Sequence, residues 1–231
     1  MLKKVLITLT IVLVLINIFL INTYGYYERR LIRLISIGAY FLVFIYYSGA
    51  KNKNILLVFS LLISVDILGL FFEKGLVSII GPLIKLISYF FIIKEVIKKI
   101  KFKKINKPIY FFLGVVILLN LLLVYQTVWS TFLKINNYIE SAVYIVYGSI
   151  NVAVCIAALN YNFRYGTNRS IYYLYFVFAL VLSDACWFIA YYLDSNSAFY
   201  FDILFYLVAL CFIILYALDT KNQDDVLLIE D

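Results

Sequence analysis

Residues 171–218 read IYYLYFVFALVLSDACWFIAYYLDSNSAFYFDILFYLVALCFIILYAL. Two apolar runs, each long enough to cross a bilayer as a helix, are separated only by the turn Asp194-Ser195-Asn196-Ser197. A connection this short places the two helices side by side and antiparallel. We therefore predict a transmembrane helical hairpin over residues 171–193 and 197–218.

The same pattern fills the rest of the chain. Of its 231 residues, 65% are hydrophobic and 14% are charged, whereas a soluble domain has about 45–50% apolar and about 25% charged residues. Further spans are predicted at 5–21, 31–47, 54–72, 75–94, 109–126 and 138–159. We expect an all-α, polytopic membrane bundle of about eight helices, with a single transmembrane domain over residues 1–218 and an acidic cytoplasmic tail at 219–231.

The polar composition excludes several classes of function. The net charge is +7, but the basic residues lie in short loops such as Lys94 to Lys107, where they favour contact with lipid headgroups over binding to nucleic acid. The chain has no histidine, and its three cysteines all lie within apolar runs. We therefore expect no metal, no cofactor and no nucleic-acid partner.

The distribution of Lys and Arg predicts an orientation. If the N-terminus is cytoplasmic, the inner segments carry 14 of the 20 basic residues and the outer segments carry five, while Lys85 lies within a span. Cytoplasmic loops are enriched in basic residues, so we predict a multi-pass protein of the cell (inner) membrane with both termini in the cytoplasm. The first apolar run is followed by Asn22 rather than by a small-residue cleavage site, and we expect it to remain as the first span.

A weak internal repeat links the third and seventh spans. Val58-Phe-Ser-Leu-Leu-Ile-Ser-Val-Asp66 and Val177-Phe-Ala-Leu-Val-Leu-Ser-Asp184 share their order of apolar residues, serine and aspartate, with an offset of one residue. One interpretation is two four-helix halves related by an axis along the membrane normal. The other is chance similarity between two apolar helices.

Ionisable residues within the spans mark the candidate site. Such residues are energetically unfavourable in a bilayer, so each one is taken as a hypothesis for a functional site. Asp66 and Asp184 are predicted about 9 Å and about 13 Å below the same membrane surface, and Lys85 lies near the middle of the fourth span. Small residues on the same helical faces, such as Gly69 and Gly81, indicate contact between helices. These faces are predicted to converge on a polar interior cavity.

A simpler interpretation treats these charges as structural. Asp66 and Lys85 would then form an ion pair that holds two neighbouring helices together, but this leaves Asp184 without an evident basic partner inside the spans. The abundant tyrosines are interpreted as an interfacial belt and as packing, with none assigned to the site.

The segments around the two aspartates resemble a known family. Phe178-Ala-Leu-Val-Leu-Ser183-Asp184, together with the segment that ends at Asp66 and is followed by Gly75-Leu76, is similar to the acidic motifs of the YhhN-like lysoplasmalogenase family. Arg33 falls where members commonly have a lysine before proline. The chain differs from the family at Val65, where glycine is usual, at Leu34 in place of that proline, and in lacking a histidine in the fourth span.

The resemblance implies hydrolysis of the vinyl-ether bond of lysoplasmalogens, a lipid substrate, in a divergent member of the family. One carboxyl group would donate a proton to carbon and the other would activate water; a low-dielectric site with two nearby carboxyls can hold them in different protonation states. Asp66 and Asp184 are the predicted catalytic residues. Lys85, Arg33 and Asp202 are the predicted substrate-binding residues.

Two other functions use the same features. A non-catalytic lipid or small-molecule transporter would have a cavity that connects to water on alternating sides. A sensor or scaffold would have every charged side chain paired and no cavity.

Overall fold

The computed structural model describes residues 2–48, 52–73, 75–97, 107–135 and 137–219. Over these ranges the regular structure is entirely helical. The helices are α1 (Leu2–Thr23), α2 (Tyr26–Ser48), α3 (Lys53–Gly69), α4 (Val77–Ile97), α5 (Lys107–Ser130), α6 (Phe132–Ile135), α7 (Tyr138–Tyr165), α8 (Asn168–Tyr192) and α9 (Asn196–Leu218).

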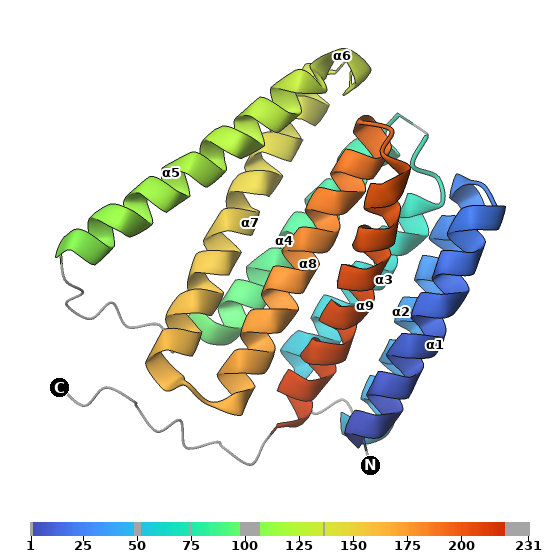
Figure 1. The fold of residues 1–231 in the computed structure, drawn as a ribbon, viewed down its shortest axis with the longest axis vertical. Coiled ribbons are helices and arrows are strands. Elements are labelled where there is room, and N and C mark those ends of the chain that lie inside the picture. Colours follow the sequence, from blue (N-terminus) through green and yellow to red (C-terminus); the bar gives the residue numbers. More distant parts are fainter. Residues whose placement is uncertain (1, 49–51, 74, 98–106, 136, 220–231) are drawn as a thin grey trace.

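The all-helical membrane bundle predicted from the sequence is confirmed. Six helices, α1, α2, α4, α7, α8 and α9, are long and apolar enough to cross a membrane. The other two long helices lie along these spans, α3 against α2 and α4 and α5 against α7 (Figure 1); that they also cross the bilayer remains a prediction. Successive long helices alternate in direction, so α1 begins and α9 ends at the same end of the bundle (Figure 1). The predicted acidic tail lies almost entirely outside the described residues.

Several helices extend beyond the predicted spans, whereas α3 ends at Gly69, before the predicted end at residue 72. Helix α2 begins at Tyr26 rather than at 31, and α7 continues to Tyr165 rather than ending at 159. The apolar runs mark only the part of each helix that lies in hydrocarbon, whereas the backbone continues as helix until a cap satisfies its end. Gly166 ends α7 with φ 55°, and the Thr167 side chain accepts a hydrogen bond from the Ser170 backbone at the start of α8. The single-turn helix α6 was not predicted.

Six helices form a closed ring around the interior. Each contacts the next in the order α2, α3, α4, α7, α8 and α9, and α9 returns to α2. Helix α1 packs outside this ring against α2 and α9, and α5 packs outside it against α7. In Figure 1, α1 and α5 accordingly lie at opposite edges of the bundle.

The ring brings distant parts of the sequence together. The most extensive contact is between α8 and α9, the hairpin predicted from residues 171–218. Tyr173, at the start of α8, donates a hydrogen bond to the backbone carbonyl of Ile92 on α4, 2.7 Å away. On the outer side, Asn17 of α1 donates to Ser36 of α2 at 3.2 Å. Such polar contacts supply specificity that apolar packing lacks when the surroundings are also apolar.

The peripheral position of α5 depends on a small residue in α7. A Cβ atom added at Gly148 would lie 2.5 Å from Cγ1 of Val124 on α5, which is closer than real contacts allow. We predict that Gly148→Ala lowers the free energy of unfolding by about 1–3 kcal/mol, measured by titrating the reconstituted protein with a denaturing detergent. Gly114→Ala is the matched control, because nothing lies within 4 Å of its added Cβ. Val124→Ala should restore most of the loss, and equal effects at the two glycines would contradict the close contact.

Candidate active site

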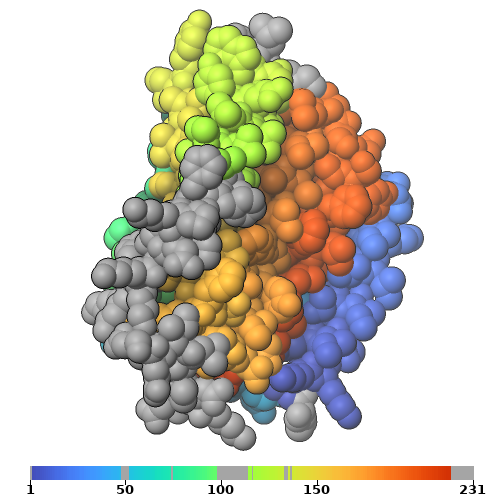
Figure 2. Space-filling model, turned by 60° about the vertical axis from the view of Figure 1, so that its left-hand side comes forward, coloured from blue at the N-terminus to red at the C-terminus, as the bar shows by residue number. Residues whose placement is uncertain are grey.

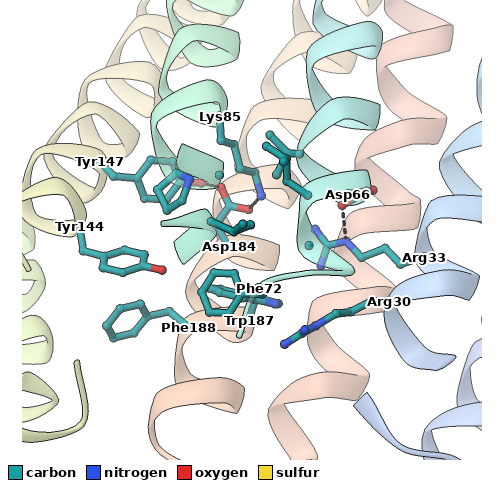
Figure 3. Close-up of a pocket in the computed structure, with 16 residues that line it drawn as sticks. Arg30, Arg33, Asp66, Phe72, Lys85, Tyr144, Tyr147, Asp184, Trp187 and Phe188 are labelled. Atoms are coloured by element: carbon teal, nitrogen blue, oxygen red, sulfur yellow. Dashed lines mark hydrogen bonds and ion pairs between the residues drawn. The ribbon is translucent and has the colours of Figure 1, made fainter. Parts of the chain in front are cut away.

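Every helix of the ring contributes a polar side chain to the interior. These side chains are Arg33 of α2, Asp66 of α3, Lys85 of α4, Tyr147 of α7, Asp184 of α8 and Asp202 of α9. The three aspartates are 8%, 5% and 4% exposed, in that order. Asp66, Lys85 and Asp184 line one cavity of about 90 Å³, and Figure 3 shows Asp184 beside Lys85 and Asp66 beside Arg33. The helical faces that carry Asp66, Lys85 and Asp184 thus meet at one cavity, but its lining is mostly apolar rather than polar as predicted.

Asp184 is surrounded by donors. Lys85 forms an ion pair with its Oδ1. The hydroxyl groups of Tyr89, at 2.5 Å, and of Tyr147 both donate hydrogen bonds to its Oδ2. Both carboxylate oxygens of Asp184 are thus engaged by donors from α4 and α7.

Asp66 shares its cation with a second acid. Arg33 donates from Nη1 to both oxygens of Asp202, at 2.9 Å and 2.7 Å, while its Nε lies 3.2 Å from Oδ1 of Asp66. This second contact satisfies the distance of an ion pair but not the geometry of a hydrogen bond. Tyr206 donates to the other Asp66 oxygen at 2.6 Å, and its ring lies 3.9 Å beneath the guanidinium.

One guanidinium therefore serves two buried carboxyl groups. Asp202 takes two of its contacts, whereas Asp66 takes one, at a longer distance. Asp66 and Asp184 therefore differ in how completely a cation is committed to them.

The pairing differs from the simplest interpretation of the sequence. In that alternative interpretation, Lys85 pairs with Asp66 and Asp184 has no evident basic partner within the spans. The structure instead pairs Lys85 with Asp184 and Arg33 with Asp66. The ring order explains this result. Helix α4 contacts α7 as well as α3, so its inward face can reach across to α8.

The two aspartates have equivalent surroundings in the two halves of the chain. Asp66, on the third helix of the first half, accepts a hydrogen bond from Tyr206 on the fourth long helix of the second half. Asp184, on the third long helix of the second half, accepts one from Tyr89 on the fourth helix of the first. This exchange is what two parallel repeats related by a two-fold axis would produce, and it favours a true repeat over chance similarity.

The equivalence extends to the remaining partners but exchanges one charge. Arg33 and Tyr147, on the second long helices of the two halves, contact Asp66 and Asp184 respectively. One helical turn before each tyrosine of the fourth helices stands Lys85 in the first half and Asp202 in the second. A base in one half thus corresponds to an acid in the other, so the two catalytic candidates have different environments.

Tyrosines are the site residues that sequence reasoning missed. Tyr89, Tyr147 and Tyr206 all donate to the aspartates, although the tyrosines had been interpreted mostly as belt and packing and none had been assigned to the site. A signal was present for Tyr89, which follows Lys85 by four residues and so shares its helical face. Tyr206 had the same signal, because it follows Asp202 by four residues. Tyr147 had no such signal, because its relevance depends on which helices face each other.

The predicted substrate-binding residues are already engaged within the protein. Lys85 and Arg33 are each paired with carboxylates, and Asp202 also accepts a hydrogen bond from Ser183 at 2.6 Å. Asp202 lines a separate, smaller cavity of about 40 Å³ together with Arg33. Their role toward a substrate remains a prediction. Within the described ranges, no group of three or more acidic, cysteine or histidine side chains could hold a metal ion.

No protein-family model, curated protein or solved structure matches the chain. The geometry of the site and the chemistry of its residues therefore carry the functional argument.

We predict that energetic coupling follows the observed pairs. Lys85→Met leaves Asp184 without its cation and should lower the free energy of unfolding by about 3–5 kcal/mol. Adding Asp184→Asn should recover at least about 1 kcal/mol of that loss, whereas Asp66→Asn combined with Lys85→Met should be additive within about 0.5 kcal/mol. The measurement is a double-mutant cycle on the reconstituted protein. Stronger coupling of Lys85 to Asp66 than to Asp184 would contradict the pairing.

Proposed function

We propose that the protein is a membrane-embedded hydrolase that cleaves the vinyl-ether bond of lysoplasmalogens, as its resemblance to the YhhN-like lysoplasmalogenases implies. The observation that carries the proposal is one cavity lined by two aspartates with unlike partners: Asp184 with a full set of donors, and Asp66 with a share of one cation. Intramembrane ionisable residues are functional by default, and buried ion pairs contribute little to stability compared with apolar packing.

Asp66 is the proposed proton donor. Arg33 lies farther from Asp66, at 3.2 Å, than from Asp202, at 2.7 Å. Asp66, unlike Asp202, also lines the cavity of about 90 Å³ that contains Asp184. Protonation of the vinyl carbon distal to the ether oxygen breaks the carbon–carbon double bond and leaves an oxocarbenium-like centre on the adjacent carbon. The electron pair of the new C–H bond comes from the double bond, and Asp66 becomes a carboxylate.

Asp184 is the proposed base and electrostatic partner. Its charge, held by Lys85 and two phenols, stabilises the cationic centre and accepts a proton from the attacking water. The resulting hemiacetal collapses to a fatty aldehyde and the free hydroxyl of the glycerophospho product. In the collapse, Asp184 gives its proton to the departing oxygen, and the hemiacetal hydroxyl gives its proton to the Asp66 carboxylate, which restores the starting protonation states of both residues.

The chain's setting follows from the charges of its loops. We propose that both termini are cytoplasmic and that the protein resides in the cell (inner) membrane, since the basic residues favour this orientation. The end of the bundle where α3 turns into α4 would then face outward. Because Asp66 lies one turn before the end of α3, the cavity would be near the outer headgroups, where a lysolipid presents its ether bond.

The proposal is tested by aldehyde release from lysoplasmalogen by the purified, reconstituted protein. We expect Asp66→Asn and Asp184→Asn each to lower the rate by about 10²–10⁴-fold, the usual contribution of a general acid or base. Glu95→Gln is the control: Glu95 also accepts hydrogen bonds, from Asn54 and Tyr216, but does not line the cavity. It should retain activity within a few-fold of wild type.

Two outcomes would overturn parts of the proposal. Absence of aldehyde release by wild type would end the hydrolase assignment and leave the carrier interpretation, which uses the same cavity without chemistry. Full activity in either asparagine variant would remove that aspartate from the mechanism.

A further inference from the structure

Arg30 is a cation at the cavity that the proposed mechanism leaves unused. It lines both the 90 Å³ cavity and its smaller neighbour, and its side chain is 12% exposed. Its Nη1 lies 2.7 Å from Glu73, whose side chain is 61% exposed. Its buried Nη2 makes no hydrogen bond of ordinary geometry with any described residue, although the hydroxyl of Tyr191 lies nearby. Arg30 therefore retains a donor for an anion, and its present partner is a displaceable surface carboxylate.

A long apolar groove lies on the other side of Asp184. Helices α5, α7 and α8 enclose about 480 Å³. Its lining includes Leu123, Val124, Val152, Leu159, Val181 and Ala185. The groove exists because α5 contacts α7 but makes no contact of comparable extent with any other ring helix. In Figure 2 the surfaces of α5 (green) and α8 (orange) lie next to each other on the outside of the molecule.

The groove and the polar cavity share a wall. Tyr144, Tyr147, Asp184 and Phe188 line both. From the level of Tyr144 to that of Leu159, the groove follows α7 for about 22 Å at 1.5 Å per residue. This length accommodates one lipid chain, because the chains of one leaflet occupy half of a core about 30 Å thick.

The cation and the groove are arranged in the same order as the parts of a lipid, with the charged group near the membrane surface and the hydrocarbon chain deeper in the membrane. Arg30 lies in the second turn of α2, near the end of the bundle and hence near the headgroups, whereas the groove runs toward the opposite end. The aspartates lie between the two. Bidentate guanidinium groups favour phosphate over neutral headgroups.

We propose that the protein binds one single-chain, phosphate-bearing amphiphile, with its phosphate at Arg30 and its hydrocarbon chain in the groove between α5, α7 and α8. This assignment rests on the proposed function in one respect: it places the substrate's ether bond beside Asp66 and Asp184. It places the phosphate at Arg30 rather than at the predicted substrate-binding residues Lys85 and Arg33, which are paired with aspartates.

The test uses a ligand that cannot be cleaved. A tritiated 1-alkyl lysophospholipid, with a saturated ether in place of the vinyl ether, is titrated onto the full-length protein in nanodiscs, and empty nanodiscs are subtracted. We expect saturable binding that unlabelled ligand displaces. A 1-alkylglycerol, which lacks phosphate, should compete about tenfold more weakly or worse. Inorganic phosphate and a two-chain phospholipid should not compete, because the first lacks a chain and the second has one chain too many.

Matched variants test the two ends separately. Arg30→Gln should weaken binding about tenfold, and Glu73→Gln should tighten it by releasing Arg30. Val152→Trp fills the groove and should weaken binding about tenfold or more, whereas Val146→Trp, six residues earlier on α7 at a position 51% exposed and outside the groove, should leave it unchanged. Ala185→Phe fills the groove from α8 and replaces Val152→Trp if that variant fails to fold.

The possible results distinguish a failure of this binding proposal from a failure of the proposed hydrolase activity. Equal competition by the alkylglycerol, or unchanged binding in Arg30→Gln, would remove Arg30 as the phosphate site. Equal affinity in Val152→Trp, Ala185→Phe and Val146→Trp would remove the groove. Aldehyde release without these effects would leave the hydrolase standing with its substrate bound elsewhere, and saturable binding without aldehyde release would support a carrier.

Discussion

The structure depends on one constraint: a charge inside a bilayer must have a partner. Five charged side chains from five ring helices meet below the α3–α4 turn, and each of them contacts an opposite charge. Arg33 bridges α3 and α9 through Asp66 and Asp202, and Lys85 bridges α4 and α8 through Asp184. Since apolar side chains pack against lipid about as well as against each other, these pairs fix the neighbours of each helix more specifically than the apolar packing does.

A repeated scaffold here produces two unlike carboxyl groups. Each aspartate accepts a hydrogen bond from a tyrosine of the opposite half, so the two halves are built alike around them. The exchange of Lys85 for Asp202 at equivalent positions breaks the likeness. It gives Asp184 a cation of its own and makes Asp66 share Arg33 with a second acid. Acid–base chemistry by two carboxyls requires such a difference, because one must hold a proton while the other remains ionised.

The two halves also differ in how their first helices, α1 and α5, pack against the ring. Helix α1 packs against two ring helices, α2 and α9, and so closes its side of the bundle, whereas α5 packs against α7 and leaves the groove beside α8. Gly148 permits the close contact with Val124 that holds α5 in this position. One side of the molecule therefore serves packing, and the other provides space next to Asp184 that a lipid chain fits.

The sequence by itself determined the class of the protein, most of its spans, and the aspartates and lysine of the cavity. The length of an apolar run and the presence of a charged residue within it are local properties, so they can be recognised from the sequence alone. Helical periodicity also placed Asp66, Lys85 and Asp184 on inward faces. The pairing of Lys85 with Asp184, the sharing of Arg33, and the roles of Tyr89, Tyr147 and Tyr206 were decided only by the tertiary structure. Periodicity states which face of a helix is polar, but the partner of that face depends on the order of the helices around the ring, and apolar surfaces that pack equally well against many neighbours do not encode that order.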